Sequence, residues 1–327
     1  MSSLEKWIDP LKGKRVVVLA DLVADIFLHG EIARISREAP VLILNQRDKR
    51  YVPGGGANAI HNIWSLGGIP HPVGIVGEDT EGDHLVKHFA SLGIDTSDIE
   101  KAPGYQTPTK MRILAGMPHG YLQQVVRVDW GSALPHPSLI KKMRARLKTA
   151  LKQADAFLIS DYGYGLITPE GVLAIGPVPL PTFLDSRFSF HRFSGITAST
   201  PNESEVEAAL GFSIGGSMET LNRAGQMMRK RLKQDALLIT RGKDGMALFE
   251  RGKKPVHIPV YGADEVTDVT GAGDTVIATF TLARSAGASF VEAAQLANVA
   301  GGIVVMKRGT ATVSANELRA AVRSLPD

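Results

Sequence analysis

Short apolar runs rich in β-branched residues recur along the chain, and segments with helical periodicity lie between them. A continuous apolar run of this length is typical of a strand that is buried on both faces. We expect strands at 15–20, 72–76, 156–160, 182–185, 196–199, 236–240 and 245–249. We expect helices from the glycines at 54–56 to Leu66, and over 81–92, 137–152, about 272–287 and about 290–306. This alternation predicts an α/β fold, a mostly parallel sheet sandwiched by helices.

One region departs from this rhythm. Residues 109–129 alternate between polar and apolar around a turn at 117–120, which predicts a β-hairpin. Together with about 27–50, which contains the apolar run 41–44, this hairpin predicts a small separate sheet. No internal repeat or low-complexity linker divides the chain. We therefore expect one domain over 1–327, with the small sheet formed by about 27–50 and 107–129.

Composition narrows the class of protein. Of the 327 residues, 44% are hydrophobic, so a large core is expected, and the absence of cysteine excludes disulfides, thiolate zinc sites and cysteine nucleophiles. The net charge of +4 fits anionic small substrates as well as an ordinary solvated surface. The basic run at 141–148 reads as the outer face of an amphipathic helix, so no nucleic-acid partner is expected. No signal peptide or membrane span is visible, and we expect a cytoplasmic protein.

Polar residues end several of the expected strands: Asp21, Asp161, Asp185 and Thr240. In an open α/β sheet, ligands bind outside the carboxyl ends of the strands. Polar residues also simply begin loops, but four such endings together favour one shared cleft.

The segment Gly271-Ala272-Gly273-Asp274 opens the first of the two late helices. Glycines let backbone amides approach a ligand closely, and the positive end of a helix favours an anion. Asp274 beside such an anion makes sense as a base that takes a proton from an attacking hydroxyl. The alternative is ordinary helix chemistry, since an acidic residue in the first turn stabilises the helix dipole.

Two further segments allow more than one interpretation. Asn202 and Glu205 could organise a magnesium ion and its waters, but Thr200 with Glu203 has the spacing of a capping box. The run 54–59 matches a dinucleotide fingerprint, but it does not follow the first strand, as that fingerprint usually does. The alternative is a glycine-rich turn where the backbone and Asn58 contact a polyhydroxylated ligand.

Four segments in this order resemble the signatures of the ribokinase-like (PfkB) carbohydrate kinases. They are Gly54–Asn58, Thr200–Glu205, Thr240–Gly245 and Asp268–Thr275. Within that family, Arg34–Val41, Thr109–Arg112 and Ser160–Tyr162 are similar to segments of the bacterial heptose 7-phosphate kinases of lipopolysaccharide-core synthesis.

The chain also departs from those kinases at four positions. Ala20 replaces a glycine, Ile26 an arginine, Arg37 a proline, and Arg187 follows Ser186 where D-P-K is usual. We expect the changes at Ala20 and Arg37 to lie near the sugar, and turnover of another sugar would point to Ile26 and Arg37 as the reason.

The resemblance implies an α/β kinase with a small β-sheet lid, which uses ATP and Mg²⁺ and pairs into a homodimer through the lid. The implied phosphotransfer residues are Asp274 as base, with the amides of Gly271, Ala272 and Gly273 as an anion hole. The implied sugar contacts are Asp21, Asp25, Gly55, Gly56 and Asn58, with Lys110, Arg112 and Arg187 for a phosphate on the substrate. The implied nucleotide contacts are Asn202, Glu205, Thr240, Gly242, Gly245 and Asn298, the first two also holding Mg²⁺ through water. Asp268 and Thr270 resemble ligands of a monovalent cation, K⁺, in some relatives.

The expected reaction is phosphorylation of a heptose 7-phosphate to the 1,7-bisphosphate. A kinase for another sugar, sugar phosphate or nucleoside, or a non-catalytic sensor on the same fold, stays open as an alternative. The sensor is disfavoured because the base and the anion hole are both present.

Overall fold

The computed structural model describes residues 4–116, 122–131, 137–262 and 268–325. Among these residues, nine strands form the larger sheet. In spatial order they are β13 (Val256–Ile258), β12 (Met246–Glu250), β11 (Ala236–Thr240), β10 (Ala198–Ser199), β9 (Thr182–Ser186), β8 (Ala156–Asp161), β1 (Arg15–Ala20), β4 (Ile69–Gly77) and β5 (Ile99–Ala102). Neighbouring strands from β11 to β5 run parallel, and β12 and β13 add an antiparallel edge.

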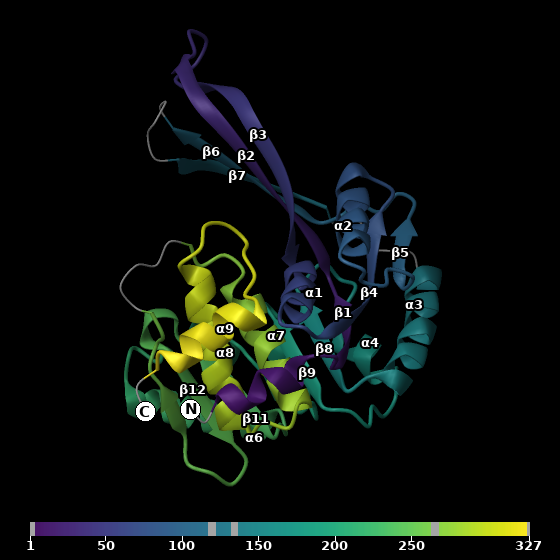
Figure 1. The fold of residues 1–327 in the computed structure, drawn as a ribbon, viewed down its shortest axis with the longest axis vertical. Helices are drawn as coiled ribbons and strands as arrows, with labels where there is room; N and C mark the ends of the chain where they lie inside the picture. Colours follow the sequence, from purple (N-terminus) through teal and green to yellow (C-terminus); the bar gives the residue numbers. More distant parts are fainter. Residues whose placement is uncertain (1–3, 117–121, 132–136, 263–267, 326–327) are drawn as a thin grey trace.

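Helices cover both faces of this sheet (Figure 1). Successive β1 side chains alternate between two apolar cores, because side chains on a strand point to opposite faces: Val16 and Val18 join one core, Val17 and Leu19 the other. The first core contains α1 (Gly56–Ser65), α2 (Thr80–Ser91), α7 (Ala272–Ser285), α8 (Phe290–Val305) and α9 (Ala315–Arg323). The second contains α3 (Pro137–Ala150), α4 (Pro169–Leu173), α5 (Glu203–Leu210) and α6 (Met218–Arg231). The predicted α/β class is confirmed.

A smaller sheet projects from the body as an arm (Figure 1). Its strands, in spatial order, are β3 (Leu42–Gly55), β2 (Leu22–Ile35), β6 (Thr109–Gly116) and β7 (Gln123–Trp130). The pairs β2–β3 and β6–β7 are antiparallel, and β2–β6 is parallel. Both predicted segments contribute, but β2 begins at Leu22 and β3 ends at Gly55, so the arm grows directly out of β1. The expected turn at 117–120 lies outside the described residues.

The strands expected in the body are present, with small differences at their ends. The strand expected over 245–249 begins one residue later, because Gly245 has φ 77° and is therefore outside the extended region. The segment 196–199 is shortened to Ala198–Ser199. In the described part of the chain, none of the helices combines the length and the apolar character that a membrane crossing requires.

Candidate active site

The carboxylate of Asp274 lies buried in the first turn of α7, where both of its oxygens accept hydrogen bonds. The Tyr162 hydroxyl donates to Oδ1 at 2.7 Å, and the Asn58 amide donates to Oδ2 at 3.0 Å. Burial raises the pKa of Asp274 to about 7, against these two hydrogen bonds, which lower it. A carboxylate with a pKa near neutrality can exchange a proton at physiological pH, as a general base must.

The packing of α1 against α7 places Asn58 beside Asp274. Asn62 donates to Asn58 Oδ1 at 3.1 Å, and the Thr275 hydroxyl donates to Asn62 Oδ1 at 3.1 Å. Gly271 caps α7 with φ 80°, and a Cβ there would lie 2.5 Å from the Asn58 amide nitrogen. Position 271 therefore needs glycine for its backbone conformation and for space.

The N-terminus of α7 supplies part of the predicted anion hole. The N–H groups of Gly273 and Asp274 lie in the first turn, where no carbonyl exists one turn earlier in the helix. The N–H of Ala272, by contrast, donates to the carbonyl of Val269 at 3.3 Å. The expected three-amide cradle is therefore incomplete in this structure, since Ala272 already has a partner.

A buried ion pair lies between the arm and the body. Asp25 on β2 contacts Arg112 on β6 at 2.8 Å, and the Thr310 hydroxyl donates to Asp25 Oδ2 at 2.8 Å. Two of the residues expected on the sugar side, Asp25 and Arg112, thus lie together, and their opposite charges are paired with each other. Lys110 lies over the ring of Tyr162, with its Nζ 4.9 Å from the ring centroid, and so stands near the base.

The four polar strand ends meet at one edge of the sheet but have different roles. Asp21 Oδ2 accepts the N–H of Tyr162 at 2.8 Å, and burial raises its pKa to about 7. Asp161 accepts the hydroxyls of Ser186 and Ser189, each at 2.6 Å. Asp161 thus binds neighbouring loops instead of facing a cleft, and the expectation of one cleft lined by all four is wrong for this residue.

Glycines at the end of β3 allow the arm and α1 to approach β1. A Cβ at Gly56 would lie 2.6 Å from the Cβ of Ala20, and one at Gly55 would lie 2.8 Å from a methyl group of Val23. Packing alone therefore accounts for Gly55 and Gly56. Their expected contact with sugar hydroxyls stays a prediction.

Four of the six expected nucleotide contacts line one cavity of about 210 Å³: Thr240, Gly242, Gly245 and Asn298. Ala272 and Gly273 line the same cavity, so it opens onto the N-terminus of α7. The Asn298 amide donates to the carbonyl of Pro259 at 2.8 Å. A mostly apolar cavity with a few polar groups, ending at a helix N-terminus, fits a nucleotide. The apolar part would hold the nucleobase, and the helix N-terminus would face the phosphates.

The capping box expected at Thr200 and Glu203 is wrong by two residues. Asn202 Oδ1 accepts the N–H of Glu205 at 2.8 Å, and Glu205 Oε2 accepts the N–H of Asn202 at 2.9 Å. The two residues proposed for magnesium therefore cap α5. Burial raises the pKa of Glu205 to about 7, and Arg187, which lines the same hollow, opposes that rise.

Electrostatics near Asp185 fit a divalent cation held through water. Burial raises the pKa of Asp185, and the nearby charges of Asp274 and Glu205 raise it further. Buried carboxylates repel one another when they are ionised. A cation that prefers oxygen ligands would stabilise their ionised form. Within the described ranges, no cluster of three or more His, Cys, Asp or Glu is placed to hold a metal directly. A divalent ion at this site would therefore contact these carboxylates through its bound water molecules.

The carboxylate of Asp268 has a visible structural role. Its oxygens accept the N–H groups of Thr270 at 2.9 Å and Gly309 at 3.1 Å, which joins the loop before α7 to the loop after α8. These contacts do not form a cage for K⁺, and the monovalent-cation role of Asp268 and Thr270 stays a prediction.

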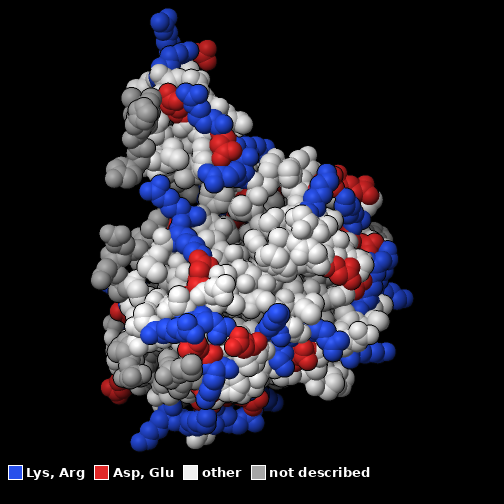
Figure 2. All heavy atoms as spheres, in the orientation of Figure 1, with Lys and Arg blue, Asp and Glu red and all other residues white. Residues whose placement is uncertain are grey.

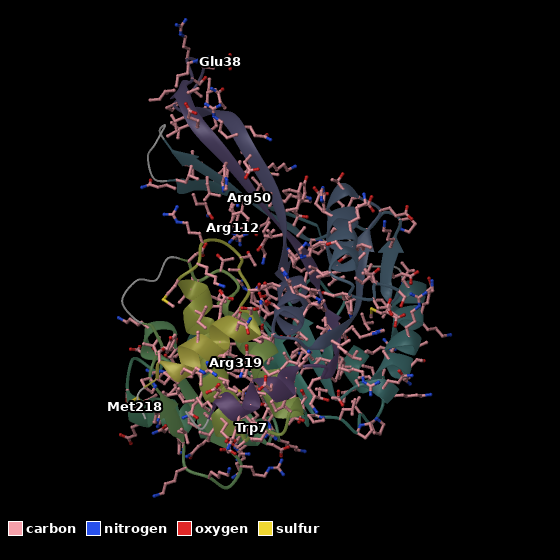
Figure 3. All side chains as sticks on the ribbon, viewed as in Figure 1. Trp7, Glu38, Arg50, Arg112, Met218 and Arg319 are labelled. Carbon is pink, nitrogen blue, oxygen red and sulfur yellow. The ribbon has the colours of Figure 1, made fainter. Side chains whose placement is uncertain are left out.

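Two departures from the heptose kinase pattern, Ile26 and Arg37, do not lie where a direct effect on the choice of sugar would need them. Ile26 is fully buried, on the opposite face of β2 from Asp25 and Phe27, because side chains alternate on a strand. Arg37 is exposed beside Glu38, which Figure 3 shows at the far end of the arm. Neither side chain is placed to contact a sugar bound at Asp274 of the same chain.

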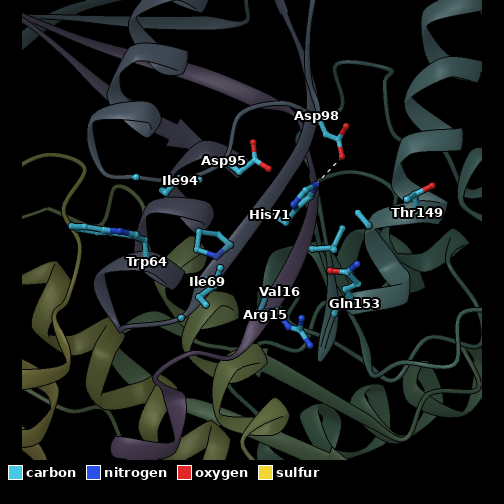
Figure 4. A pocket seen from close by; sticks show the side chains of 16 residues that line it. Arg15, Val16, Trp64, Ile69, His71, Ile94, Asp95, Asp98, Thr149 and Gln153 are labelled. Atoms are coloured by element: carbon cyan, nitrogen blue, oxygen red, sulfur yellow. Dashed lines mark hydrogen bonds and ion pairs between the residues drawn. The ribbon is translucent and has the colours of Figure 1, made fainter.

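Another cavity, of about 630 Å³, lies elsewhere (Figure 4). Its lining includes Arg15, Ile69 and His71, near the amino ends of β1 and β4. His71 Nε2 and Asp98 Oδ2 form a hydrogen bond of 2.8 Å. Since Asp274 lies at the carboxyl ends of the strands, this cavity is not part of the candidate site.

Tyr162 belongs to the motif Ser160–Tyr162, but the sequence alone predicted no role for its side chain. Its position directly after a buried strand was the available signal. Its hydrogen bond holds one oxygen of Asp274 and favours the ionised carboxylate.

Tyr162→Phe should shift the acidic limb of the pH dependence of kcat/KM upward by about one unit. A hydrogen bond to a charged group contributes about 1.5–3 kcal/mol, and one pKa unit corresponds to about 1.4 kcal/mol. Without the hydroxyl, Asp274 ionises at higher pH, so activity should appear at higher pH. An unshifted limb with an unchanged maximum would show that Tyr162 does not act on the base.

Comparison with known proteins gives the family. The model of the pfkB family carbohydrate kinases matches residues 14–126 and 181–317, which include every motif described above except Ser160–Tyr162. The chain belongs to the pfkB family of carbohydrate kinases. It is therefore a phosphotransferase of the sugar kinase class, as predicted.

The pfkB kinase is similar to two proteins named bifunctional protein HldE. That of Pelobacter propionicus is 37% identical over 327 residues, which cover 98% of this chain and 65% of the relative. That of Geobacter sulfurreducens is 38% identical, over 92% of this chain and 61% of the relative. The chain thus spans somewhat less than two thirds of these relatives.

Solved structures share the fold of this pfkB kinase. Arabidopsis thaliana ribokinase complexed with ribose and ATP has a TM-score of 0.72 at 20% identity, over 95% of this chain and 99% of that one. Escherichia coli phosphofructokinase-2 in complex with substrates and products has a TM-score of 0.75 at 17% identity, over 94% and 98%. The expected ribokinase-like fold is confirmed.

Proposed function

We propose that this pfkB kinase transfers the γ-phosphate of ATP to a hydroxyl of a sugar phosphate, with Asp274 as general base. The observation that carries the proposal is the position of Asp274. It is buried, has a pKa near 7, and lies one residue from Gly273, which lines the 210 Å³ cavity. A base beside a helix N-terminus that faces the cavity proposed for the nucleotide is the arrangement that phosphoryl transfer requires.

In the proposed reaction, the carboxylate of Asp274 takes the proton of the attacking hydroxyl. The hydroxyl oxygen forms a bond to the γ-phosphorus, the bond from that phosphorus to the oxygen shared with the β-phosphate breaks, and ADP leaves. The N–H groups of Gly271 and Gly273 stabilise charge on the transferred group. Lys110, next to Tyr162, adds positive charge on the sugar side.

Asn202 and Glu205 would hold the waters of a bound Mg²⁺, and Arg187 lines the same hollow. The metal, when bound, supplies charge neutralisation on the ATP phosphates. A parallel β-bridge joins the backbones of Asn202 and Thr240, so a residue of the proposed cation site lies beside one that lines the nucleotide cavity.

The proposed acceptor is D-glycero-D-manno-heptose 7-phosphate, which would become the 1,7-bisphosphate. The similarity of Arg34–Val41 to heptose 7-phosphate kinases and the match to the HldE proteins support this choice. The test is ATP turnover against a panel of sugars, sugar phosphates and nucleosides. Turnover confined to the heptose phosphate supports the proposal. Turnover of another acceptor would reject the heptose phosphate as the substrate and would still support a kinase. ATP binding without any turnover would favour a sensor.

The arm exposes apolar side chains that fit a homodimer. They are Ile35, Val41, Leu42, Leu122, Val125, Val126 and Val128. The edge strand β7 is exposed on both faces, and an exposed apolar edge favours pairing with another chain.

We expect Val126→Lys to convert a dimer to a monomer, because it would bury a charge in the proposed interface. Sedimentation velocity measures this directly, with Met227→Lys, an exposed position on α6, as the matched control. A wild-type monomer, or a Val126→Lys variant that still dimerises, would contradict pairing through the arm.

A further inference from the structure

A second cavity, of about 450 Å³, lies between the arm and the loop that joins α8 to α9. From the arm it is lined by Phe27, His29 and Arg50, and from the loop by Arg308 and Thr310. In Figure 1 this loop, in yellow, rises from the body toward the arm. Figure 2 shows Lys and Arg side chains both on the arm and on the body beneath it.

This cavity continues outward from the site of the base. Asp25, Phe27 and His29 share one face of β2, because side chains alternate on a strand. The hydrogen bond from the Thr310 hydroxyl to Asp25 marks the inner end of the cavity, and His29 marks its outer end. Four residues of strand separate the two, which corresponds to about 13 Å.

Arg308 is the cation that a ligand in this cavity would meet. Among the described residues, no ion-pair or hydrogen-bond partner exists for its exposed guanidinium. Arg50 already donates to Asp48 at 2.7 Å and contacts His29 Nδ1 at 3.1 Å. The carboxylate of Asp268 also lines the cavity, but both of its oxygens accept backbone N–H groups.

The three residues that the sequence predicted for a substrate phosphate lie elsewhere. Arg112 is neutralised by Asp25. Lys110 stands beside Tyr162 at the reacting end, and Arg187 lines the hollow with Asn202 on the nucleotide side. Figure 3 shows Arg50 farther out on the arm than Arg112. The outer end of the cavity therefore has its own set of cations.

The loop that carries Arg308 is fixed in place. Gly309 has φ 72°, its N–H donates to Asp268 at 3.1 Å, and a Cβ there would lie 3.4 Å from the ring of Phe27. The Thr310 hydroxyl donates a hydrogen bond to Asp25. With the backbone held directly after Arg308, mainly the Arg308 side chain needs to move to bind an anion, which lowers the entropic cost of binding.

We propose that Arg308, assisted by Arg50 and His29, binds the phosphate that the sugar substrate already carries. This inference rests on the proposed function and narrows it. The ligand class is an extended sugar phosphate, whose phosphate lies at the end of the molecule opposite the hydroxyl that reacts at Asp274. A guanidinium suits this role because its N–H groups match phosphate oxygens in pairs.

The test compares Arg308→Leu with the wild type on a sugar phosphate and on the same sugar without its phosphate. The KM for the sugar phosphate should rise about 10- to 100-fold, because a charge-assisted hydrogen bond contributes about 1.5–3 kcal/mol. The kcat, and the kinetics of the unphosphorylated sugar, should change less than about twofold. Arg308→Lys should restore part of the affinity. Arg231→Leu, which removes the same charge from exposed α6, is the matched control.

Equal effects on both sugars, or no effect on either, would overturn the role of Arg308 while leaving the kinase proposal intact. If the wild type phosphorylates nothing, the proposed function fails, and a titration of inorganic phosphate followed by ³¹P NMR decides the subsite separately. Weaker phosphate binding by Arg308→Leu than by Arg231→Leu supports the subsite. Equal binding by the two variants rejects it.

Discussion

Asp274→Asn is expected to lower kcat by about 10²–10⁴-fold and to leave the affinity for ATP nearly unchanged. The amide cannot take the proton of the attacking hydroxyl, which is the contribution that general-base catalysis makes. The nucleotide cavity is lined by other residues, so ATP should still bind. Single-turnover kinetics and calorimetric titration of ATP measure the two quantities. Near-normal turnover by the variant would show that Asp274 is not the base.

The same variant has a predicted effect on stability that serves as an independent control. Burial raises the pKa of folded Asp274 to about 7, from an ordinary value of 3.8. Between these pH values the folded protein holds a proton that the unfolded chain has released, so this residue makes the free energy of unfolding fall as pH rises. Asp274→Asn should remove that slope. Urea unfolding at pH 5 and pH 8 measures it.

Asp25→Ala is expected to destabilise the protein by about 3–5 kcal/mol and to raise the KM for the sugar substrate by at least about tenfold. The change leaves Arg112 buried without its partner, which is the costly way to break a buried ion pair. It also removes the carboxylate and its bond from Thr310 at the inner end of the sugar cavity. Urea unfolding and steady-state kinetics measure the two effects.

A double variant separates the structural effect from the binding effect. Asp25→Ala with Arg112→Leu should recover part of the lost stability, because no buried charge remains unpaired. The KM should stay high, because the proposed contact with the sugar is still absent. A double variant with a normal KM would mean that Asp25 only holds the arm and does not contact the sugar.

The body of the fold was largely predictable, because strands buried on both faces produce apolar runs that are visible in the sequence. The arm was harder to delimit. Residues 30–50 of β2 and β3 are mostly exposed or only partly buried, so they carry no apolar periodicity that marks a strand. The capping box of α5 was also predicted two residues too early, because the sequence pattern there is ambiguous. Two overlapping pairs, Thr200 with Glu203 and Asn202 with Glu205, both fit the spacing, and only the start of α5 selects between them.

The sequence by itself predicted a base and a phosphate cradle, since Gly271 to Asp274 are contiguous and the pattern that follows them predicts a helix. Only the tertiary structure decided what surrounds them. Tyr162 lies 112 positions from Asp274 in sequence, and Thr310 lies 285 positions from Asp25. Such contacts depend on how the arm, the sheet and the loop after α8 pack together. No local pattern records that packing, so Tyr162 and Arg308 gained their proposed roles only once the chain was folded.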